Sequence, residues 1–495
     1  MTIDSSETEI IYSSPPERIV SLVVASWAVI LAIVVGICLL VTAGQYWVPR
    51  QKSISGAELM SVNMLAKSLV GFKMAEQSAI QQIDSLKEGP IEQRLAHVFL
   101  VNEVAGAEKA AIQLEEVELA VHDFQKANGM DDEEEPSFPN KSQKQLQELT
   151  RKLISAYQDE EYDTSNITDE ERILLDKSLG WVGELALTPK ESPDTSARQT
   201  VEDEGKRVVM LMMVGGVLFF LVLASSLVAL FIFGGLLMNQ HLSLQLKNKT
   251  EHGFVYIETF ALWIAMFMGL QLMIGLFGGL FGRPSTSIVL SPLAFFGSLL
   301  ALAWPIQRGL SWKTLRSDLG LEIRNPFIEI MAGGSAYIAL IIPILMGIIT
   351  SAGIGGLIDA TATPSEFESV APAGHPIMDE ITAGGPLMYI MIGLSACVCA
   401  PIVEEIMFRG VLYRYLRDAT GHMSARWMSV IASAFFGGLI FAAVHPQGII
   451  GIPVLTVLAM GFAIVREWRN SLIAPMFMHA IHNGAVTCFI LLMIG

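Results

Sequence analysis

Two adjacent glutamates near the end of an apolar run are the first residues of this 495-residue chain whose spacing could support chemistry. Glu405 and Arg409 are four residues apart with the acid first, the favourable order for an ion pair on one helix face. Glu404 points about 100° away and has no such local partner. Because burial disfavours the charged form of an unpaired carboxylate, we expect Glu404 to be a general base and Glu405 to be structural. The alternative for both is an interfacial charge at a helix end.

A histidine and an aromatic residue share a face at the end of the next apolar run. His445 follows a run whose only other polar side chains are Ser429 and Ser433, and Phe441 lies one turn before it. A single histidine in such a run is more often a hydrogen-bonded core residue than a catalytic one. It becomes a candidate only beside the other polar groups.

The last apolar run holds a third group. His479 and Asn483 are four residues apart on one helical face, and His482 lies three residues after His479. An imidazole and an amide on one face suit metal ligation or hydrogen-bond donation to an oxyanion; the alternative is a hydrogen bond between helices. Ionisable groups are costly inside a membrane and usually functional there. The three late runs concentrate them, whereas Glu258 and Glu329 are isolated.

These residues lie on segments long and apolar enough to cross a bilayer, which takes about 20 residues. Hydrophobic residues make up 52% of the chain and charged residues 16%, and the mean hydropathy is +0.49, as in membrane proteins rather than soluble domains. The predicted fold is all-α, a polytopic membrane helix bundle of about nine spans. The spans are Ile19–Ala43, Val208–Met238, Phe254–Phe281, Ser287–Ile306, Phe327–Thr350, Pro386–Val403, Trp427–Val444, Gly451–Val465 and Ser471–Ile494.

An acidic extramembrane domain is predicted between the first and second spans. The net charge is −17, with 49 acidic against 32 basic residues, which argues against a nucleic-acid partner. Residues 44–207 alone hold 31 acidic and 18 basic residues, a net of −13. Helical spacing of apolar residues predicts helices there, and Thr168 with Glu171 predicts a capping box. The acidic stretch 131–139, which contains prolines, should split this domain into two lobes.

The predicted organisation is an N-terminal tail (1–18), a membrane anchor helix (19–43), the acidic helical domain (44–207), preceding membrane helices (208–385) and a core with the candidate site (386–495). Loops rich in Lys and Arg usually face the cytoplasm. Basic residues follow the fourth and sixth spans, whereas 351–385 contains none. We therefore expect an integral protein of a bacterial inner membrane, with the acidic domain and the C-terminus outside. Straight spans would then separate Glu404 from His445 by on the order of 10 Å, unless the stretch 408–415 is also buried.

The order Glu-Glu-x-x-x-Arg, Phe-x-x-x-His and His-x-x-x-Asn in late membrane helices resembles the CPBP (CAAX protease and bacteriocin-processing, Rce1-like) family. The local context agrees: Ala400-Pro401 precedes the two glutamates, Phe408-Arg409-Gly410-Val411-Leu412 follows them, and Ala474-Pro475-Met476 precedes the third motif. The resemblance covers roughly residues 386–495. It implies an intramembrane endopeptidase acting on membrane proteins or lipidated peptides, such as prenylated CAAX-type proteins.

The resemblance also implies roles for the polar residues. Glu404 would activate water with help from His445, and His479 and Asn483 would stabilise the oxyanion. The supporting residues would be Glu405, Arg409, Phe441 and His482. The family description leaves a metal-free mechanism and a Zn²⁺ held by Glu404, His445 and His479 both open.

Two other functions remain open from the residues alone. One is a non-catalytic membrane scaffold whose acidic domain binds a protein partner. The other is a transporter with a buried Glu/His proton relay; the lack of an inverted repeat counts against it.

Overall fold

The computed structural model describes residues 56–128, 139–158, 167–190, 195–239, 253–280, 286–322, 325–361 and 385–494, with positions 30, 34, 36–37, 54, 241–242, 244–246 and 367. Within these ranges every regular element is a helix and there is no strand. The predicted all-α class is confirmed for this part of the chain.

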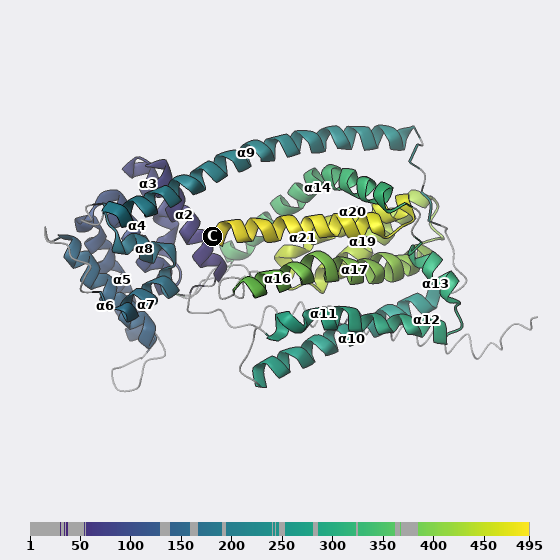
Figure 1. The fold of residues 1–495 in the computed structure, drawn as a ribbon, viewed down its shortest axis with the longest axis horizontal. Coiled ribbons are helices and arrows are strands. Elements are labelled where there is room, and N and C mark those ends of the chain that lie inside the picture. The colour runs from purple at the N-terminus through teal and green to yellow at the C-terminus, as the bar shows by residue number, and fades with distance from the viewer. Residues whose placement is uncertain are drawn as a thin grey trace, which may run out of the picture.

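Seven α-helices form a lobe at one end of the molecule (Figure 1). They are α2 (Gly56–Phe72), α3 (Glu76–Ile83), α4 (Ile91–Ala105), α5 (Ala107–Ala127), α6 (Lys141–Gln158), α7 (Asp169–Leu179) and α8 (Trp181–Leu187), with the 3₁₀ helix η1 (Asp84–Lys87) after α3. Helix α4 is central, with Leu95, Val98 and Phe99 buried. Amphipathic helices must bury their apolar stripes against one another, and here they share one hydrophobic cluster.

The predicted division of the acidic domain into two lobes is wrong, because α6 packs against both α4 and α5 from across the acidic stretch. The predicted capping box is confirmed at the start of α7. The Thr168 hydroxyl accepts from the Glu171 backbone N–H (3.2 Å), and the Glu171 carboxylate accepts from the Thr168 N–H (2.8 Å).

Helix α9 (Thr195–Met238) connects the lobe to the bundle without a break. Its 44 residues give a length of about 66 Å. Its beginning packs on α2 so closely that a Cβ added to Gly71 would lie 2.2 Å from the Gly205 carbonyl oxygen. Figure 1 shows α9 leaving the lobe and running along the outside of the bundle.

Eight helical segments are long and apolar enough to cross a membrane, which makes the chain an integral membrane protein. They are formed by α9, α10 (Gly253–Leu280), α11 to α12 (Thr286–Ser298, η3 Leu299–Leu302 and Ala303–Gln307), α14 (Pro326–Thr361), α16 to α18 (Pro386–Ala419), α19 (Arg426–Ala443), α20 (Gly448–Arg469) and α21 (Ile473–Ile494). They correspond to the predicted second to ninth spans. The first predicted span, 19–43, lies outside the described residues except at positions 30, 34, 36 and 37, so the total of nine remains a prediction.

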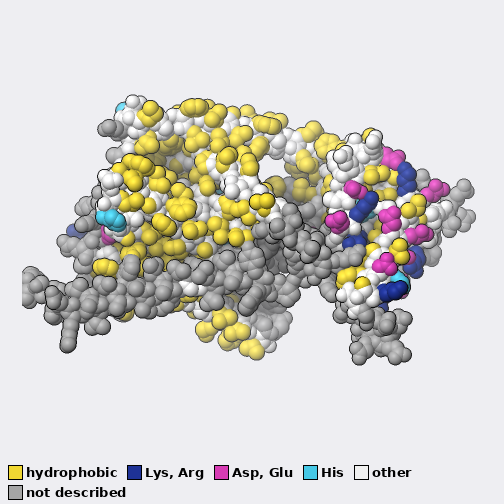
Figure 2. Space-filling model, turned by 180° about the vertical axis from the view of Figure 1, so that it is seen from behind, with side chains coloured by type: hydrophobic (Ala, Val, Ile, Leu, Met, Phe, Trp, Pro, Cys, Tyr) yellow, Lys and Arg dark blue, Asp and Glu magenta, His cyan; other side chains and the backbone are white. Residues whose placement is uncertain are grey.

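The bundle has a central layer of helices that carry the candidate site. Helix α20 packs against α19 and α14, and α21 packs against α14 and α20. Helices α10 and α11 form one edge, and the C-terminal end of α21 lies beside the lobe (Figure 1). Figure 2 shows hydrophobic side chains over the membrane helices and charged ones gathered on the lobe. The short α13 (Trp312–Leu319) lies at the end of the bundle away from the lobe.

One span is longer than predicted. The expected span Pro386–Val403 continues to Ala419 through α16 (Pro386–Leu394), the π-helix η4 (Ser395–Cys399), α17 (Ala400–Glu404), the π-helix η5 (Glu405–Leu412) and α18 (Tyr413–Ala419). All eight residues of η5 are buried. Glu404 therefore lies within this span rather than at its end.

A serine of α9 stabilises a proline kink in α14. Pro343 has no N–H, so the carbonyl of Ala339 loses its usual helical donor. The Ser226 hydroxyl lies 3.4 Å from this carbonyl and accepts a hydrogen bond from the Ile342 N–H (3.1 Å). A neighbouring hydroxyl is a common way to satisfy such a group in a membrane helix.

Candidate active site

Three predicted site residues, from α17, from the turn that follows α19 and from α21, converge on one point. The Nε2 atoms of His445 and His479 each lie 3.9 Å from the Oε2 atom of Glu404. Oε2 is buried and has no hydrogen-bond partner within the protein. The expected separation of about 10 Å between Glu404 and His445, which assumed straight spans, is wrong, because the Glu404 span continues for fifteen further residues to Ala419.

Glu405 fixes the second histidine of this group. Its Oε1 atom accepts a hydrogen bond from Nη1 of Arg409 (2.8 Å) and lies 2.9 Å from Nδ1 of His479. A carboxylate paired with a guanidinium is an acceptor only, so Nδ1 of His479 carries the hydrogen. In the neutral imidazole, Nε2 is then an acceptor that faces Glu404. Glu405 is therefore the orienting partner of His479 as well as the predicted partner of Arg409.

Aromatic rings enclose the guanidinium of Arg409. Its carbon lies 4.7 Å from the ring centre of Phe441 and 5.0 Å from that of Phe462, and Nη2 donates to the Ala459 carbonyl (3.3 Å). A planar guanidinium can stack on aromatic faces while it bonds a carboxylate. The site thus holds a buried charge pair at a fixed depth in the bundle.

The backbone fixes the orientation of His445. Its Nδ1 atom lies 2.5 Å from the carbonyl oxygen of Phe441, and a carbonyl oxygen can only accept. Nδ1 therefore carries the hydrogen, and Nε2 is the nitrogen that faces Glu404. The ring centres of Phe441 and His445 are 4.1 Å apart, so Phe441 packs between His445 and Arg409.

Asn483 fills a gap that a proline leaves in the π-helix. The Ala400 N–H bonds the Ser395 carbonyl, five residues back. In this register the Ala396 carbonyl would pair with residue 401, which is proline and has no N–H. Nδ2 of Asn483 donates to that carbonyl at 2.7 Å. An amide group has two N–H donors, so this contact between helices uses one of them and orients the other.

His482 makes its hydrogen bond outside the Glu404 group, although it is next to Asn483 in the sequence. Its Nδ1 atom is 3.1 Å from the hydroxyl of Tyr337 on α14. Three residues along an α-helix turn the side chain by about 300°, so His482 points about 60° to one side of His479 and faces a different neighbour.

The arrangement does not fit the Zn²⁺ alternative. Among the described residues no group of three or more His, Cys, Asp and Glu is placed to hold a metal ion. Ligands of a tetrahedral zinc lie about 3.3 Å apart, whereas both nitrogens are 3.9 Å from Glu404 Oε2. The distance suits a water molecule that bonds to a nitrogen and the carboxylate together.

Several contributors lie outside the predicted motifs. Phe462 packs on Arg409 and also on His479, with ring centres 5.4 Å apart, and Tyr337 and Pro401 act as described above. Phe462 lies one turn after Ala459, so helical spacing places both on one face of α20. Neither the residue types on this face of α20 nor their spacing reveals that the face contacts Arg409.

Buried charged side chains also join α18 to α20 at the end of the bundle away from the lobe. Nε of Arg417 on α18 lies 3.1 Å from Oε2 of Glu467 on α20, and the Tyr413 hydroxyl donates to the same oxygen (3.2 Å). Removal of one partner from a buried pair is strongly destabilising. This pair therefore helps to hold the long span that carries Glu404 against α20.

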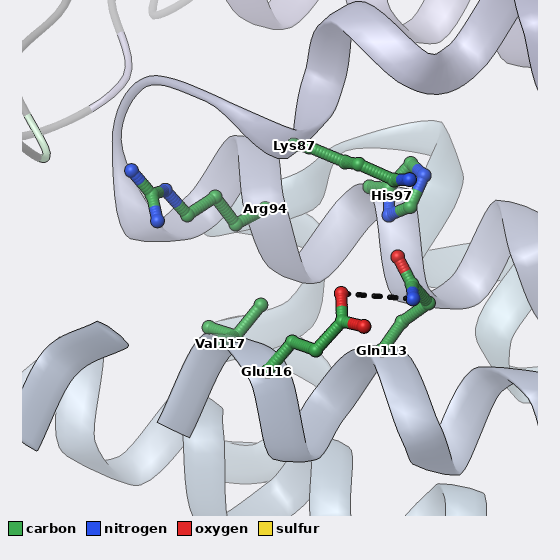
Figure 3. A pocket seen from close by; sticks show the side chains of 6 residues that line it. All are labelled: Lys87, Arg94, His97, Gln113, Glu116 and Val117. Carbon is green, nitrogen blue, oxygen red and sulfur yellow. Dashed lines mark hydrogen bonds between the residues drawn. The ribbon is translucent and has the colours of Figure 1, made fainter. Parts of the chain in front are cut away.

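Polar side chains also line a hollow in the lobe (Figure 3). It is lined by Lys87, Arg94, His97, Gln113, Glu116 and Val117, and Gln113 donates to Glu116 (2.9 Å). Burial, followed by the nearby charge of Lys87, lowers the pKa of His97 to about 4. The hollow lies between α4 and α5 in the hydrophobic cluster of the lobe, separate from the cluster around Glu404.

Comparisons with known proteins identify the segment that holds the site. Residues 386–485 match the family model described as type II CAAX prenyl endopeptidase Rce1-like. The match starts at the first residue of α16 and ends within α21, so it includes Glu404, His445, His479 and Asn483. No curated protein and no solved structure matches the chain. Residues 386–485 are therefore a domain of the Rce1-like type II CAAX prenyl endopeptidase (CPBP) family, which is a family of proteases.

Proposed function

We propose that the chain is an intramembrane endopeptidase that hydrolyses peptide bonds of membrane-associated proteins, including prenylated CAAX-type proteins. The observation that carries the proposal is the Oε2 atom of Glu404. It is buried, lacks a partner in the protein, and faces the Nε2 atoms of two imidazoles at 3.9 Å. The family match over 386–485 supports the same class of reaction.

The base of the reaction is Glu404. One water bonds to Glu404 Oε2 and His445 Nε2, since two groups 3.9 Å apart can both lie within about 2.8 Å of one oxygen. Glu404 takes a proton as the water oxygen attacks the peptide carbonyl carbon. Removal of this base lowers the rate by about 10²–10⁴-fold.

The oxyanion lies between His479 and Asn483. A doubly protonated His479 donates from Nε2 while Glu405, 2.9 Å from Nδ1, stabilises its positive charge. The second N–H of Asn483 is the other donor. Glu404 then delivers its proton to the amide nitrogen, the C–N bond breaks, and a carboxylic acid and an amine leave.

The orientation of the chain is part of the proposal. Arg308, Lys313 and Arg316 lie near α12 and α13, at the end of the bundle away from the lobe. The positive-inside bias places that end in the cytoplasm. The lobe and the C-terminal end of α21, which share the other end (Figure 1), are then external.

The test compares membranes from cells that carry wild type, Glu404→Gln or Glu258→Gln at matched abundance, by profiling protein N-termini and C-termini, because cleavage of a CAAX-type protein leaves a new C-terminus on the membrane-bound product. Glu258→Gln is the matched control, because Glu258 bonds Trp304 (2.8 Å) and Arg308 (3.3 Å) rather than the site. We expect new termini with wild type and Glu258→Gln that disappear with Glu404→Gln. Identical profiles of both kinds for all three folded proteins would overturn the proposal and leave the scaffold and the transporter as the functions to test.

A further inference from the structure

The active-site helix α21 is held by three polar contacts within little more than one turn. His479 Nδ1 lies 2.9 Å from Glu405 in η5, Asn483 Nδ2 lies 2.7 Å from the Ala396 carbonyl in η4, and His482 Nδ1 lies 3.1 Å from the hydroxyl of Tyr337. The first two contacts lie within the Rce1-like domain. The third comes from α14, which precedes residues 386–485.

Helix geometry makes the contact between His482 and Tyr337 sensitive to rotation of α21 about its own axis. At about 100° per residue, His482 points about 60° to one side of His479, and Asn483 about 40° to the other. A rotation of α21 that moves His482 away from Tyr337 therefore also moves His479 relative to Glu405, and Asn483 relative to Ala396. The contacts of His482 and Asn483, on either side of His479, therefore restrict the direction of the His479 side chain more than its own contact with Glu405 does alone.

Helix α14 is a firm support for this contact because other helices hold it along its length. Near its start, Glu329 pairs with Arg469 of α20 (2.7 Å), and a Cβ added to Gly333 would lie 2.6 Å from the Ala474 carbonyl of α21. Beyond Tyr337, Ser226 bonds the kink at Pro343. The position of the Tyr337 hydroxyl is thus set by neighbours on both sides.

We propose that Tyr337 is a positioning residue of the peptidase: through His482 it sets the rotation of α21 and so aims His479 and Asn483 at the oxyanion. This inference rests on the proposed function. Tyr337 and His482 do not touch the reacting atoms, since the proton and electron transfers involve Glu404, water and the peptide. Loss of the contact is therefore expected to slow the chemical step and leave substrate binding nearly unchanged.

The kinetic test uses the full chain in lipid nanodiscs and an internally quenched S-farnesyl peptide with a Cys-aliphatic-aliphatic-X end. Tyr337→Phe removes one hydroxyl and should lower kcat about two- to ten-fold, the range for one hydrogen bond, with KM within about two-fold of wild type. Tyr157→Phe is the matched control, because its hydroxyl bonds the Ala186 carbonyl inside the lobe; it should leave both constants unchanged.

A double-mutant cycle assigns the effect to the contact itself. His482→Phe should resemble Tyr337→Phe, and the double variant should be no worse than either single one, because both remove the same bond. His482→Gln, which keeps a hydrogen-bonding group, should recover part of the lost kcat. Additive losses, or a loss in KM alone, would overturn the positioning role.

A readout without catalysis separates the two proposals. In ¹⁵N NMR of histidine-labelled full chain, Tyr337→Phe should shift the ring signals of both His482 and His479, assigned through the substitutions of each histidine. A shift at His482 alone would overturn the inference. If wild type and Glu404→Gln cleave the peptide equally, the proposed function fails, and the NMR result still decides whether Tyr337 orients α21.

Discussion

Nδ1 of His479 lies 2.9 Å from Oε1 of Glu405, the same oxygen that accepts from Arg409 at 2.8 Å. One carboxylate oxygen thus links a permanent cation to an imidazole. The arrangement keeps the charge of the doubly protonated His479, which the proposed mechanism uses, paired in the interior of the bundle. It also gives Glu405 a part in catalysis, although Glu405 does not face the water.

The first prediction concerns the charge of Glu405. Glu405→Gln keeps the side-chain size and one acceptor but cannot stabilise a cationic His479. We expect kcat to fall about 10–100-fold, as for other partners that orient a catalytic imidazole, with little change in KM. Steady-state kinetics with the farnesyl peptide measures both, and Glu258→Gln serves as the control. A kcat equal to that of wild type would show that His479 acts without this partner.

The second prediction concerns the gap at Pro401. Asn483→Ala leaves the Ala396 carbonyl without its donor, which should cost about 1–2 kcal/mol of unfolding free energy. In a Pro401→Ala background the backbone N–H is restored and can take up that carbonyl. The cost of Asn483→Ala should then shrink clearly. SDS titration of the four proteins in mixed micelles gives the cycle, and equal costs in both backgrounds would refute the explanation.

Metal removal provides the third prediction. The described residues form no metal-binding group, and the proposed steps need only Glu404, water, the two imidazoles and Asn483. Dialysis of the full chain against a strong chelator should therefore leave kcat unchanged, and elemental analysis should find less than one zinc per chain. Loss of activity that Zn²⁺ restores would favour the metal mechanism instead.

The fourth prediction is a pH effect on the lobe. The pKa of His97 is lowered to about 4, first by burial and second by Lys87, whereas the unfolded chain has the ordinary value of about 6.5. The unfolded state therefore binds more protons between these values, and the lobe is fully stable above pH 6.5 and loses stability as the pH falls toward 4. The difference corresponds to about 3 kcal/mol at most.

Hydrogen exchange of the α4 amides in the full chain, corrected for intrinsic rates, measures this effect. Opening of α4 should become easier between pH 7 and pH 5 in wild type. His97→Leu removes the titrating group and its unpaired Nε2, and should remove most of the pH dependence. The same pH dependence in both proteins would assign it to other groups whose pKa is lowered in the folded lobe. Glu92 is not such a group, because burial raises its pKa and therefore stabilises the lobe as the pH falls.

Residue types and spacing predicted the members of the Glu404 group but not its geometry. The meeting of Glu404, His445 and His479 follows the three motifs. The end of the Glu404 span was predicted too early, because hydropathy treats each arginine as an unpaired charge. Arg409 and Arg417 are buried here because Glu405 and Glu467 pair with them, and Glu467 is 50 residues from Arg417.

Side-chain direction limited the remaining predictions. His482 is adjacent to Asn483 in the sequence but bonds Tyr337, because the deciding neighbour comes from a helix more than 100 residues earlier. The two halves of the acidic domain, which were predicted to be separate lobes, form a single lobe for a similar reason. The acidic stretch separates α5 from α6 along the chain, but the apolar faces on either side fit one another. Local pattern shows which faces are apolar and not which faces meet.

Because α9 is one continuous helix, the rotation of the lobe about the α9 axis is fixed relative to the bundle. Gly205 packs against α2 at the lobe end of α9, and Ser226 bonds α14 near Pro343 at the bundle end. Insertion of one residue between them would turn the lobe by about 100° relative to the bundle. A helix of this length is also a lever arm, on which a tilt of one degree moves the far end by about 1 Å. A change in the tilt of the lobe would therefore be passed along α9 to its contact with α14, the helix that carries Tyr337.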